Sequence, residues 1–151
     1  MSNEQIRSRD DPILLVEDNP DDVLVTQRAW KVGKFQNELL VVEDGEKALQ
    51  FLNKEGEYNG ASRPILVLLD LKMPRVDGFE VLRQAKQDAN LKSIPIIVLT
   101  TSDRENDVEK AFKLGCNAYL VKPVQFPAFI KTMLEVKEFW LTISTLPKPE
   151  D

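Results

Sequence analysis

The sequence has 151 residues, which fits one domain with a substantial core and leaves little room for a second. Its 20 basic and 25 acidic residues give a formal net charge of −5, and no basic run could follow a phosphate backbone, so we expect no nucleic-acid partner. The absence of histidine excludes Ser-His-Asp triads, histidine-bound zinc and a phosphorylated histidine of its own. The single cysteine, Cys116, cannot form an internal disulfide, which suits a reducing compartment.

The two ends of the chain are polar and lack a regular apolar pattern. We expect residues 1–11 to form a flexible arm, residues 12–141 to form one domain, and residues 142–151 to be a tail that packs partly on the last helix. The longest apolar runs have the length of strands, and the start does not resemble a signal peptide. We therefore expect no membrane partner and a cytoplasmic location.

Five short apolar runs, rich in Val, Ile and Leu, alternate with longer segments whose apolar residues recur at helical spacing. This alternation is typical of βαβ units around a parallel sheet and predicts an α/β fold. The predicted strands are Ile13–Val16, Leu39–Val42, Ile65–Leu69, Ile96–Leu99 and Ala118–Val121.

Capping residues mark where the predicted helices begin. Asn19 followed by Pro20 is an N-cap with proline at the first helical position, and Ser102 or Asp103 is expected to cap the fourth helix. Gly115 is expected to end that fourth helix. The five helices are expected over Asp21 to Val32, after Asp44-Gly45, after Asp77-Gly78, before Gly115, and from about Phe126 to Leu141.

Polar residues stand directly after four of the predicted strands: Glu17 and Asp18 after the first, Asp70 after the third, Thr100 after the fourth and Lys122 after the fifth. Ligands of an open α/β sheet bind at the carboxyl ends of its strands, so we expect these residues at one edge. Crowded carboxylates raise each other's pKa and oppose folding unless a cation intervenes, and their oxygen atoms suit Mg²⁺. The pattern therefore predicts a divalent metal ion, Mg²⁺ or Mn²⁺.

Each of these acids, taken alone, is more simply explained as a residue that ends a strand or caps a helix. Their joint placement at the strand ends favours a functional site over that explanation. Chemistry at this site would use carboxylates, a hydroxyl and an ammonium group, because the chain has no histidine.

The sequence resembles the receiver domain of bacterial two-component response regulators. The resemblance spans about Pro12 to Leu141, and it is carried by the segments LLVEDNP, LLDLKMPRVDGFEVL, IIVLTTS and YLVKP, which hold the five residues above. It implies a flavodoxin-like, doubly wound five-stranded parallel sheet of order 2-1-3-4-5, flanked by five helices.

The resemblance implies that Asp70 accepts a phosphoryl group from a phosphohistidine of a sensor histidine kinase. Glu17, Asp18 and Asp70 would hold Mg²⁺, together with the main-chain carbonyl of Lys72. An aspartate side chain is already ionised at pH 7, so this nucleophile needs no general base. The protein would not be an enzyme in the ordinary sense, since it would catalyse only its own phosphorylation and dephosphorylation.

The resemblance also implies how phosphorylation changes the protein. Lys122 would pair with one phosphoryl oxygen, and the Thr100 hydroxyl would shift to bond another. The ring of Tyr119 would then move into the vacated space and remodel a face that partners bind. The peptide bond between Lys122 and Pro123 would be cis, which aims the lysine inward.

The resemblance implies that two positions in this sequence control how fast water attacks the phosphorylated aspartate. They are Lys72, two residues after Asp70, and Ser102, two residues after Thr100. Neither side chain offers an obvious base to orient that water. We therefore expect a long-lived phosphoryl group.

Two further segments, GEYNGASRP and EFWLTISTLP, resemble the single-domain response regulators that partner cyanobacterial phytochrome kinases. This narrower resemblance implies a phytochrome-type kinase as the phosphoryl donor. A downstream phosphotransfer protein is a further possible partner. With no output domain in this sequence, the signal would leave by protein contact.

The last predicted helix carries more apolar residues than one face against a sheet requires. One explanation is an ordinary core helix with the tail packed over the surplus, and the other is a partner chain. We expect a homodimer formed through this helix. The interface candidates are Phe129, Met133, Val136, Phe139 and Trp140.

Three alternatives remain open for the function. An aspartate-nucleophile phosphohydrolase also places an aspartate after a parallel strand, but usually has a second acid two residues on, where this chain has Lys72. A flavodoxin-like nucleotide or flavin binder is disfavoured because no glycine-rich phosphate loop follows the first strand. A receiver-shaped binding module that is never phosphorylated is disfavoured by the intact acid set.

Overall fold

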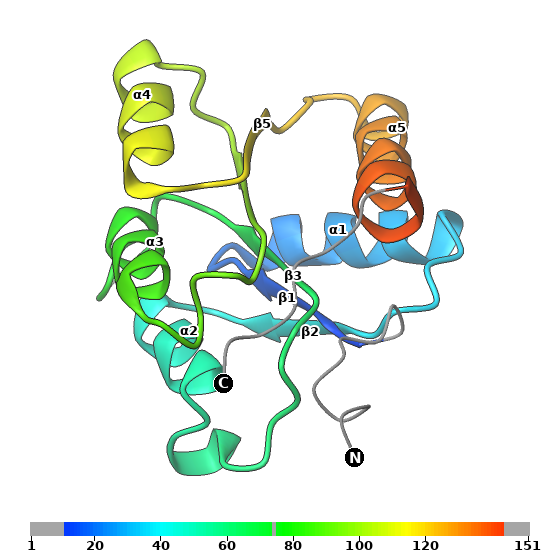
Figure 1. Cartoon of the computed structure of the whole chain (residues 1–151). Coiled ribbons are helices and arrows are strands. Elements are labelled where there is room, and N and C mark those ends of the chain that lie inside the picture. Colours follow the sequence, from blue (N-terminus) through cyan, green and yellow to red (C-terminus); the bar gives the residue numbers. More distant parts are fainter. Residues whose placement is uncertain (1–10, 74, 144–151) are drawn as a thin grey trace.

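A five-stranded parallel sheet lies at the centre of the protein, whose computed structural model describes residues 11–73 and 75–143 (Figure 1). Its strands are β1 (Ile13–Val16), β2 (Leu39–Val42), β3 (Leu66–Leu69), β4 (Ile96–Thr100) and β5 (Ala118–Val121). Their order is β2-β1-β3-β4-β5, and every neighbouring pair is parallel. The predicted fold class is confirmed, and each strand lies within one residue of its predicted bounds.

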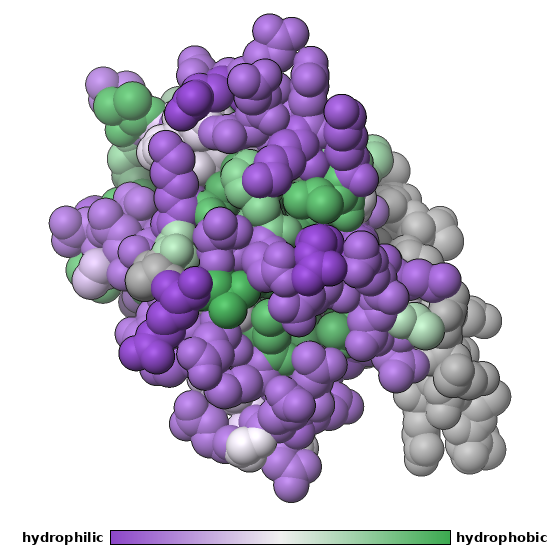
Figure 2. All heavy atoms as spheres, turned by 90° about the vertical axis from the view of Figure 1, so that its left-hand side faces the viewer, coloured by the Kyte–Doolittle hydropathy of each residue, from purple (hydrophilic) through white to green (hydrophobic). Residues whose placement is uncertain are grey.

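Helices cover both faces of the sheet (Figure 1). They are α1 (Pro20–Val32), α2 (Gly45–Leu52), the short 3₁₀ helix η2 (Gly56–Tyr58), α3 (Gly78–Gln87), α4 (Glu105–Leu114), α5 (Phe126–Val136) and the π-helix η3 (Lys137–Ile143). Buried residues of α1 and α5 share one apolar cluster, and those of α2, α3 and α4 share the other. The outer surface over α2, α3 and α4 is mainly hydrophilic, with small hydrophobic areas between the helices (Figure 2).

Strands β1, β3 and β4 are buried along their whole length, which is why they read as continuous apolar runs. Their side chains alternate between the two faces. In β1, Leu14 and Val16 join the cluster under α2, α3 and α4, whereas Ile13 and Leu15 join the cluster under α1 and α5. Because both faces are packed, the residues that follow these strands have a firmly placed backbone.

The predicted cap at Asn19 is confirmed, and the second and third helices begin at the predicted Asp44-Gly45 and Asp77-Gly78. The side chains of Asn19, Asp44 and Asp77 each accept hydrogen bonds from backbone N–H groups in the first turn of α1, α2 and α3. Gly115 ends α4 in the left-handed conformation, at a φ of 105°, as predicted.

The predicted cap of α4 is wrong. The N-cap residue is Arg104, and no side chain caps the helix. The Ser102 hydroxyl instead donates to Oδ2 of Asp107, at 2.6 Å, in the first turn of α4. This bond directs the serine side chain to a carboxylate on the helix.

The last helix is not the single α-helix predicted up to Leu141. It is α-helical to Val136 and continues as the π-helix η3. The buried side chains in this region are Phe129, Met133, Val136 and Leu141, so the final step is five residues. A spacing of five matches the wider π-turn, which brings Leu141 onto the core.

The predicted arm (residues 1–11) and tail (residues 142–151) fall almost entirely outside the described residues, so both stay predictions. Within the described ranges, no helix has the length and apolar character needed to cross a bilayer.

Candidate functional site

Three carboxylates converge where β1 and β3 end. The two strands are neighbours with Val16 opposite Leu69, so Glu17 and Asp70, the residues that follow them, come out side by side. Together with Asp18 they place one carboxylate oxygen each within 4.8 Å of one another. Glu17 is buried, Asp70 is half-buried and Asp18 is exposed, so the cluster opens to solvent on one side.

Lys122 enters this cluster from the end of β5. Its Nζ donates to Oε1 of Glu17 at 2.5 Å and to Oδ2 of Asp22 at 3.1 Å. The Lys122 side chain is only 9 % exposed, so these ion pairs are shielded from solvent on the lysine side. Sequence reasoning missed Asp22, whose only signal is its place in the first turn of a helix, where acids are common for electrostatic reasons.

Burial dominates the electrostatics of Glu17. It raises the pKa of this carboxyl to about 7, an effect that the charge of Asp70 increases and that Lys122 partly offsets. For Lys122, burial works against the charged form, but the hydrogen bond and charge of Glu17, with Asp70 and Asp22, raise its pKa overall. Three clustered carboxylates against one ammonium group leave an excess of negative charge, which a hard divalent cation would neutralise.

Hydroxyl side chains lie at the end of β4, beside the acid cluster. Thr100 ends β4 and is fully buried, and its Oγ1 lies 3.4 Å from the backbone nitrogen of Ser102. The Tyr119 hydroxyl donates to the main-chain carbonyl of Ser102 at 2.8 Å. The structure thus joins Thr100 and Tyr119 through Ser102, which is also bonded to Asp107 on α4.

The predicted cis peptide before Pro123 is wrong, because the described residues contain no cis peptide bond. The trans form is the favoured one for bonds to proline in general. Lys122 reaches the acid cluster from this trans backbone, so the inward aim that we ascribed to the cis bond does not require it.

A glycine holds the backbone of Asp70 against the start of α3. A Cβ atom on Gly78 would lie 2.2 Å from the carbonyl oxygen of Asp70, and the Gly78 N–H donates to the carbonyl of Leu71 at 2.9 Å. Only a residue without a side chain allows this approach. Sequence reasoning used Gly78 only as a helix-start signal. The neighbouring Lys72 is exposed, and no described contact involves its side chain.

Three of the five interface candidates are core residues instead. Phe129, Met133 and Val136 are at most 4 % exposed and pack under α5 against the sheet, so their availability to a partner chain was predicted wrongly. Most of the surplus apolar candidates of the last helix are therefore buried within the chain itself. Phe139 is 52 % exposed and Trp140 is partly exposed, and they remain candidates.

The sequence matches the response regulator receiver domain family over residues 13–134. The chain belongs to this family. Two curated relatives show how broad the match is. The response regulator Rcp1 of Synechocystis sp. is 43 % identical over 135 residues, which are 89 % of this chain and 92 % of Rcp1. A probable methanogenesis regulatory protein, FilR2 of Methanothrix harundinacea, is 42 % identical over 91 % of this chain and 88 % of its own length.

Solved structures agree with this membership. This receiver domain matches the phosphorylated cyanobacterial phytochrome response regulator RcpA with a TM-score of 0.87 and 41 % identity, over 93 % of this chain and 99 % of RcpA. It matches the Mn²⁺-bound form of Rcp1 with a TM-score of 0.83 and 43 % identity, over 89 % and 97 % of the two chains. The acid cluster of this receiver domain is consistent with a phosphorylated aspartate site.

Proposed function

We propose that this receiver domain accepts a phosphoryl group on Asp70 from a phosphohistidine of a sensor histidine kinase and passes the signal on by protein contact. The observation that carries the proposal is the convergence of Glu17, Asp18 and Asp70 with the ammonium group of Lys122. That set of charges suits phosphoryl transfer, which needs chiefly positioning and charge neutralisation.

The acid cluster fits a resident Mg²⁺ or Mn²⁺ ion, because three oxygen donors lie within 4.8 Å of one another. Glu17, Asp18 and Asp70 would hold the ion, with the main-chain carbonyl of Lys72 as a further ligand. The Mn²⁺-bound form of the relative Rcp1 supports this assignment. A bound ion would neutralise charge on the phosphoryl oxygens.

Asp70, Lys122 and Thr100 have separate roles in the proposed phosphoryl transfer. A carboxylate oxygen of Asp70 forms the new bond to phosphorus, the bond from phosphorus to the donor's histidine nitrogen breaks, and that nitrogen keeps the electron pair. Lys122 holds one phosphoryl oxygen, and the Thr100 hydroxyl donates to another. Movement of Thr100 would act through Ser102 on Tyr119, to which Ser102 is already bonded.

We further propose a long-lived phosphoryl group and a phytochrome-type kinase as its source. Lys72 and Ser102 offer no base that would orient an attacking water, and the Ser102 hydroxyl is already bonded to Asp107. The identity to Rcp1 and RcpA supports the phytochrome link. A phosphotransfer protein is a further candidate recipient of the group.

A homodimer through the end of α5 is the remaining part of the proposal. Phe139 and Trp140 line an open groove of about 250 Å³ with Ala118 and Leu120 of the edge strand β5. An apolar groove with exposed aromatic rings beside a sheet edge is suited to a second copy of the chain.

The decisive experiment is incubation with Mg²⁺ and acetyl phosphate, with the acyl phosphate detected by mass spectrometry. We expect one phosphoryl group on the wild type, none on Asp70→Asn, and one on the matched control Asp21→Asn, which removes an exposed acid near the site. An adduct that survives Asp70→Asn would overturn the acceptor assignment. Multiple turnover of a simple phosphate monoester would favour the phosphohydrolase instead.

The partner and the dimer are tested separately. Phosphoryl transfer from a purified phytochrome kinase should be faster than transfer from an unrelated histidine kinase. Sedimentation at tens of micromolar, with and without beryllofluoride, should show a dimer that Phe139→Ser weakens. Phe112→Ser on α4 is the matched control, because Phe112 is 50 % exposed. A wild type that is monomeric in both conditions would contradict the dimer.

A further inference from the structure

The carboxylate of Glu17 accepts hydrogen bonds and is also a proposed metal ligand. Its Oε1 accepts from Lys122 at 2.5 Å, and its Oε2 accepts from the backbone N–H of Asn19 at 3.2 Å. The same group belongs to the proposed metal-binding set. A metal ion held by Glu17 therefore draws on an oxygen that already has a hydrogen-bond partner. Of the ion pairs that Lys122 makes among the described residues, only the one with Asp22 lies outside that set.

Asp22 is held on a rigid support. The Asn19 side chain accepts from the backbone nitrogens of Asp21 and Asp22, at 2.8 and 3.3 Å, which fixes the first turn of α1. The carbonyl of Asp22 accepts from the hydroxyl of Thr26, a buried residue one turn further along, at 2.8 Å. A carboxylate on such a support can define where an ammonium group sits.

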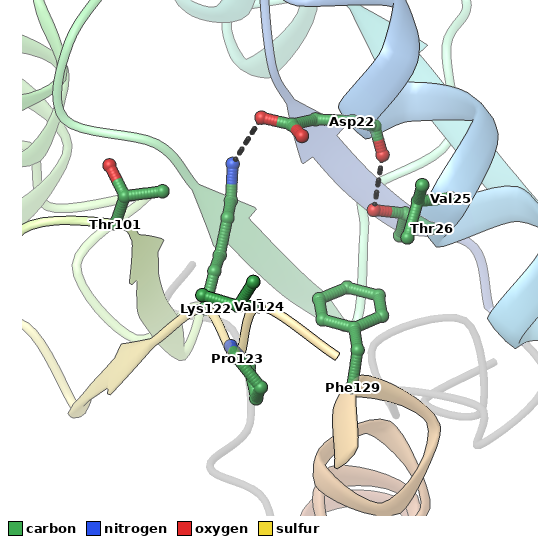
Figure 3. Close-up of a pocket in the computed structure, with 8 residues that line it drawn as sticks. All are labelled: Asp22, Val25, Thr26, Thr101, Lys122, Pro123, Val124 and Phe129. Carbon is green, nitrogen blue, oxygen red and sulfur yellow. Dashed lines mark hydrogen bonds and ion pairs between the residues drawn. The ribbon is translucent and has the colours of Figure 1, made fainter. Parts of the chain in front are cut away.

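Open space adjoins Lys122 on the side of Asp22. A pocket of about 220 Å³ lies there, between the start of α1 and the β5–α5 connection. Figure 3 shows the Lys122 side chain extending toward the Asp22 carboxylate, with Val124 near its base, Thr101 on one side and Phe129 on the other. A lysine side chain has four rotatable bonds, and side chains do not fill this pocket. When a metal ion engages Glu17 and the Asp22 carboxylate is absent, neither of these ion pairs holds the ammonium group, which can then turn into the pocket.

We propose that Asp22 is the positioning residue for Lys122. It keeps the ammonium group beside the acid cluster when Glu17 is engaged by a metal ion, and this role rests on the phosphoryl transfer proposed above. The alternative is that Asp22 competes with the phosphoryl group for the lysine. Its side chain is 39 % exposed, so solvent screens its repulsion of a phosphoryl group, whereas its hydrogen bond to Lys122 is direct.

The first test measures the rate of Asp70 phosphorylation by acetyl phosphate at saturating Mg²⁺. We expect Asp22→Ala to lower the maximal rate about fivefold and Asp22→Asn to lower it less, since the amide oxygen still accepts a hydrogen bond. Asp21→Ala is the matched control, with the same charge removed from the same helical turn and no contact to Lys122. Combined with Lys122→Gln, Asp22→Ala should have no further effect, because the two residues act as a pair.

The second test needs no phosphorylation. Acetylation of Lys122 by acetic anhydride is followed by mass spectrometry with and without Mg²⁺. With Mg²⁺ present, Asp22→Ala should label about fivefold faster than the wild type, and Asp21→Ala should label at the wild-type rate. Equal labelling of Asp22→Ala and wild type would overturn the positioning role. So would a phosphorylation rate in Asp22→Ala equal to or above that of the wild type. Failure of the wild type to accept a phosphoryl group would overturn the proposed function, and the labelling result would still decide the role of Asp22.

Discussion

The interior of the sheet and its carboxyl edge use the same strands but differ in what their burial contributes. In the interior, residues such as Leu68 and Ile97 are fully buried and apolar, so removing them from water stabilises the fold. At the edge, Glu17 is just as inaccessible, but its charge is costly to bury and needs Lys122 as a partner. The comparison indicates that the interior supplies the stability that lets the edge hold a charged site.

The largest expected effect is in the interior. Leu68→Ala should lower the free energy of unfolding by about 2–5 kcal/mol, because it removes a fully buried side chain and leaves a cavity. Urea denaturation followed by circular dichroism measures the loss. The remaining folded protein should still be phosphorylated on Asp70. A loss well below this range would mean that burial in the sheet interior contributes less to the free energy of unfolding than we infer.

Gly78 lies between the two regions and should show the next largest effect. Gly78→Ala forces a Cβ atom against the Asp70 carbonyl, and we expect it to cost about 3 kcal/mol and to slow phosphorylation as well. Gly56→Ala is the control, because its Cβ would meet no atom within 4 Å and only its φ of 58° would be strained. Equal losses in urea denaturation for the two variants would contradict the steric argument.

The charge at the edge should appear as a pH dependence. Burial raises the pKa of Glu17 from 4.5 to about 7, so within that window the folded chain keeps a proton that the unfolded chain releases. This group therefore lowers the free energy of unfolding as the pH rises, and Glu17→Gln removes its titration. Without divalent metal, the variant should gain roughly 2 kcal/mol relative to the wild type between about pH 5 and about pH 7.5. Urea denaturation at several pH values measures this difference, and free energies of unfolding that change in parallel with pH in Glu17→Gln and the wild type would refute the prediction.

The smallest expected effect concerns Ser102, which follows β4 at the carboxyl edge of the sheet. Ser102→Ala removes the hydrogen bond to Asp107, and we expect a loss of about 1 kcal/mol in the free energy of unfolding. The carboxylate of Asp107 is partly exposed and can bind water instead, which limits the cost. Double-mutant analysis with Asp107→Asn measures the coupling, and additive losses would show that the bond contributes nothing of its own.

Local patterns predicted most of the fold. The five strands, the cap at Asn19 and the helix starts at Asp44-Gly45 and Asp77-Gly78 are confirmed because each depends on a few adjacent residues. The convergence of Glu17 with Asp70 was also predictable, since parallel strands end at the same edge of a sheet.

The missed features depend on residues far apart in the chain. Asp22 and Lys122 are separated by 100 positions, and no local pattern pairs them. The excess of apolar residues in the last helix could not tell Met133, which is fully buried, from Phe139, which is exposed. Core and interface use the same side chains, so only the packing of the whole chain separates them.

The wide turn of η3 decides which aromatic rings remain on the outside. Had the chain stayed α-helical after Val136, Trp140 would have followed at the four-residue interval of the buried stripe. The extra residue in the π-turn puts Leu141 there instead. A deletion of Glu138 would place Leu141 four residues after Val136, so a regular α-helix would bring the same leucine onto the core and the wide turn would no longer be needed.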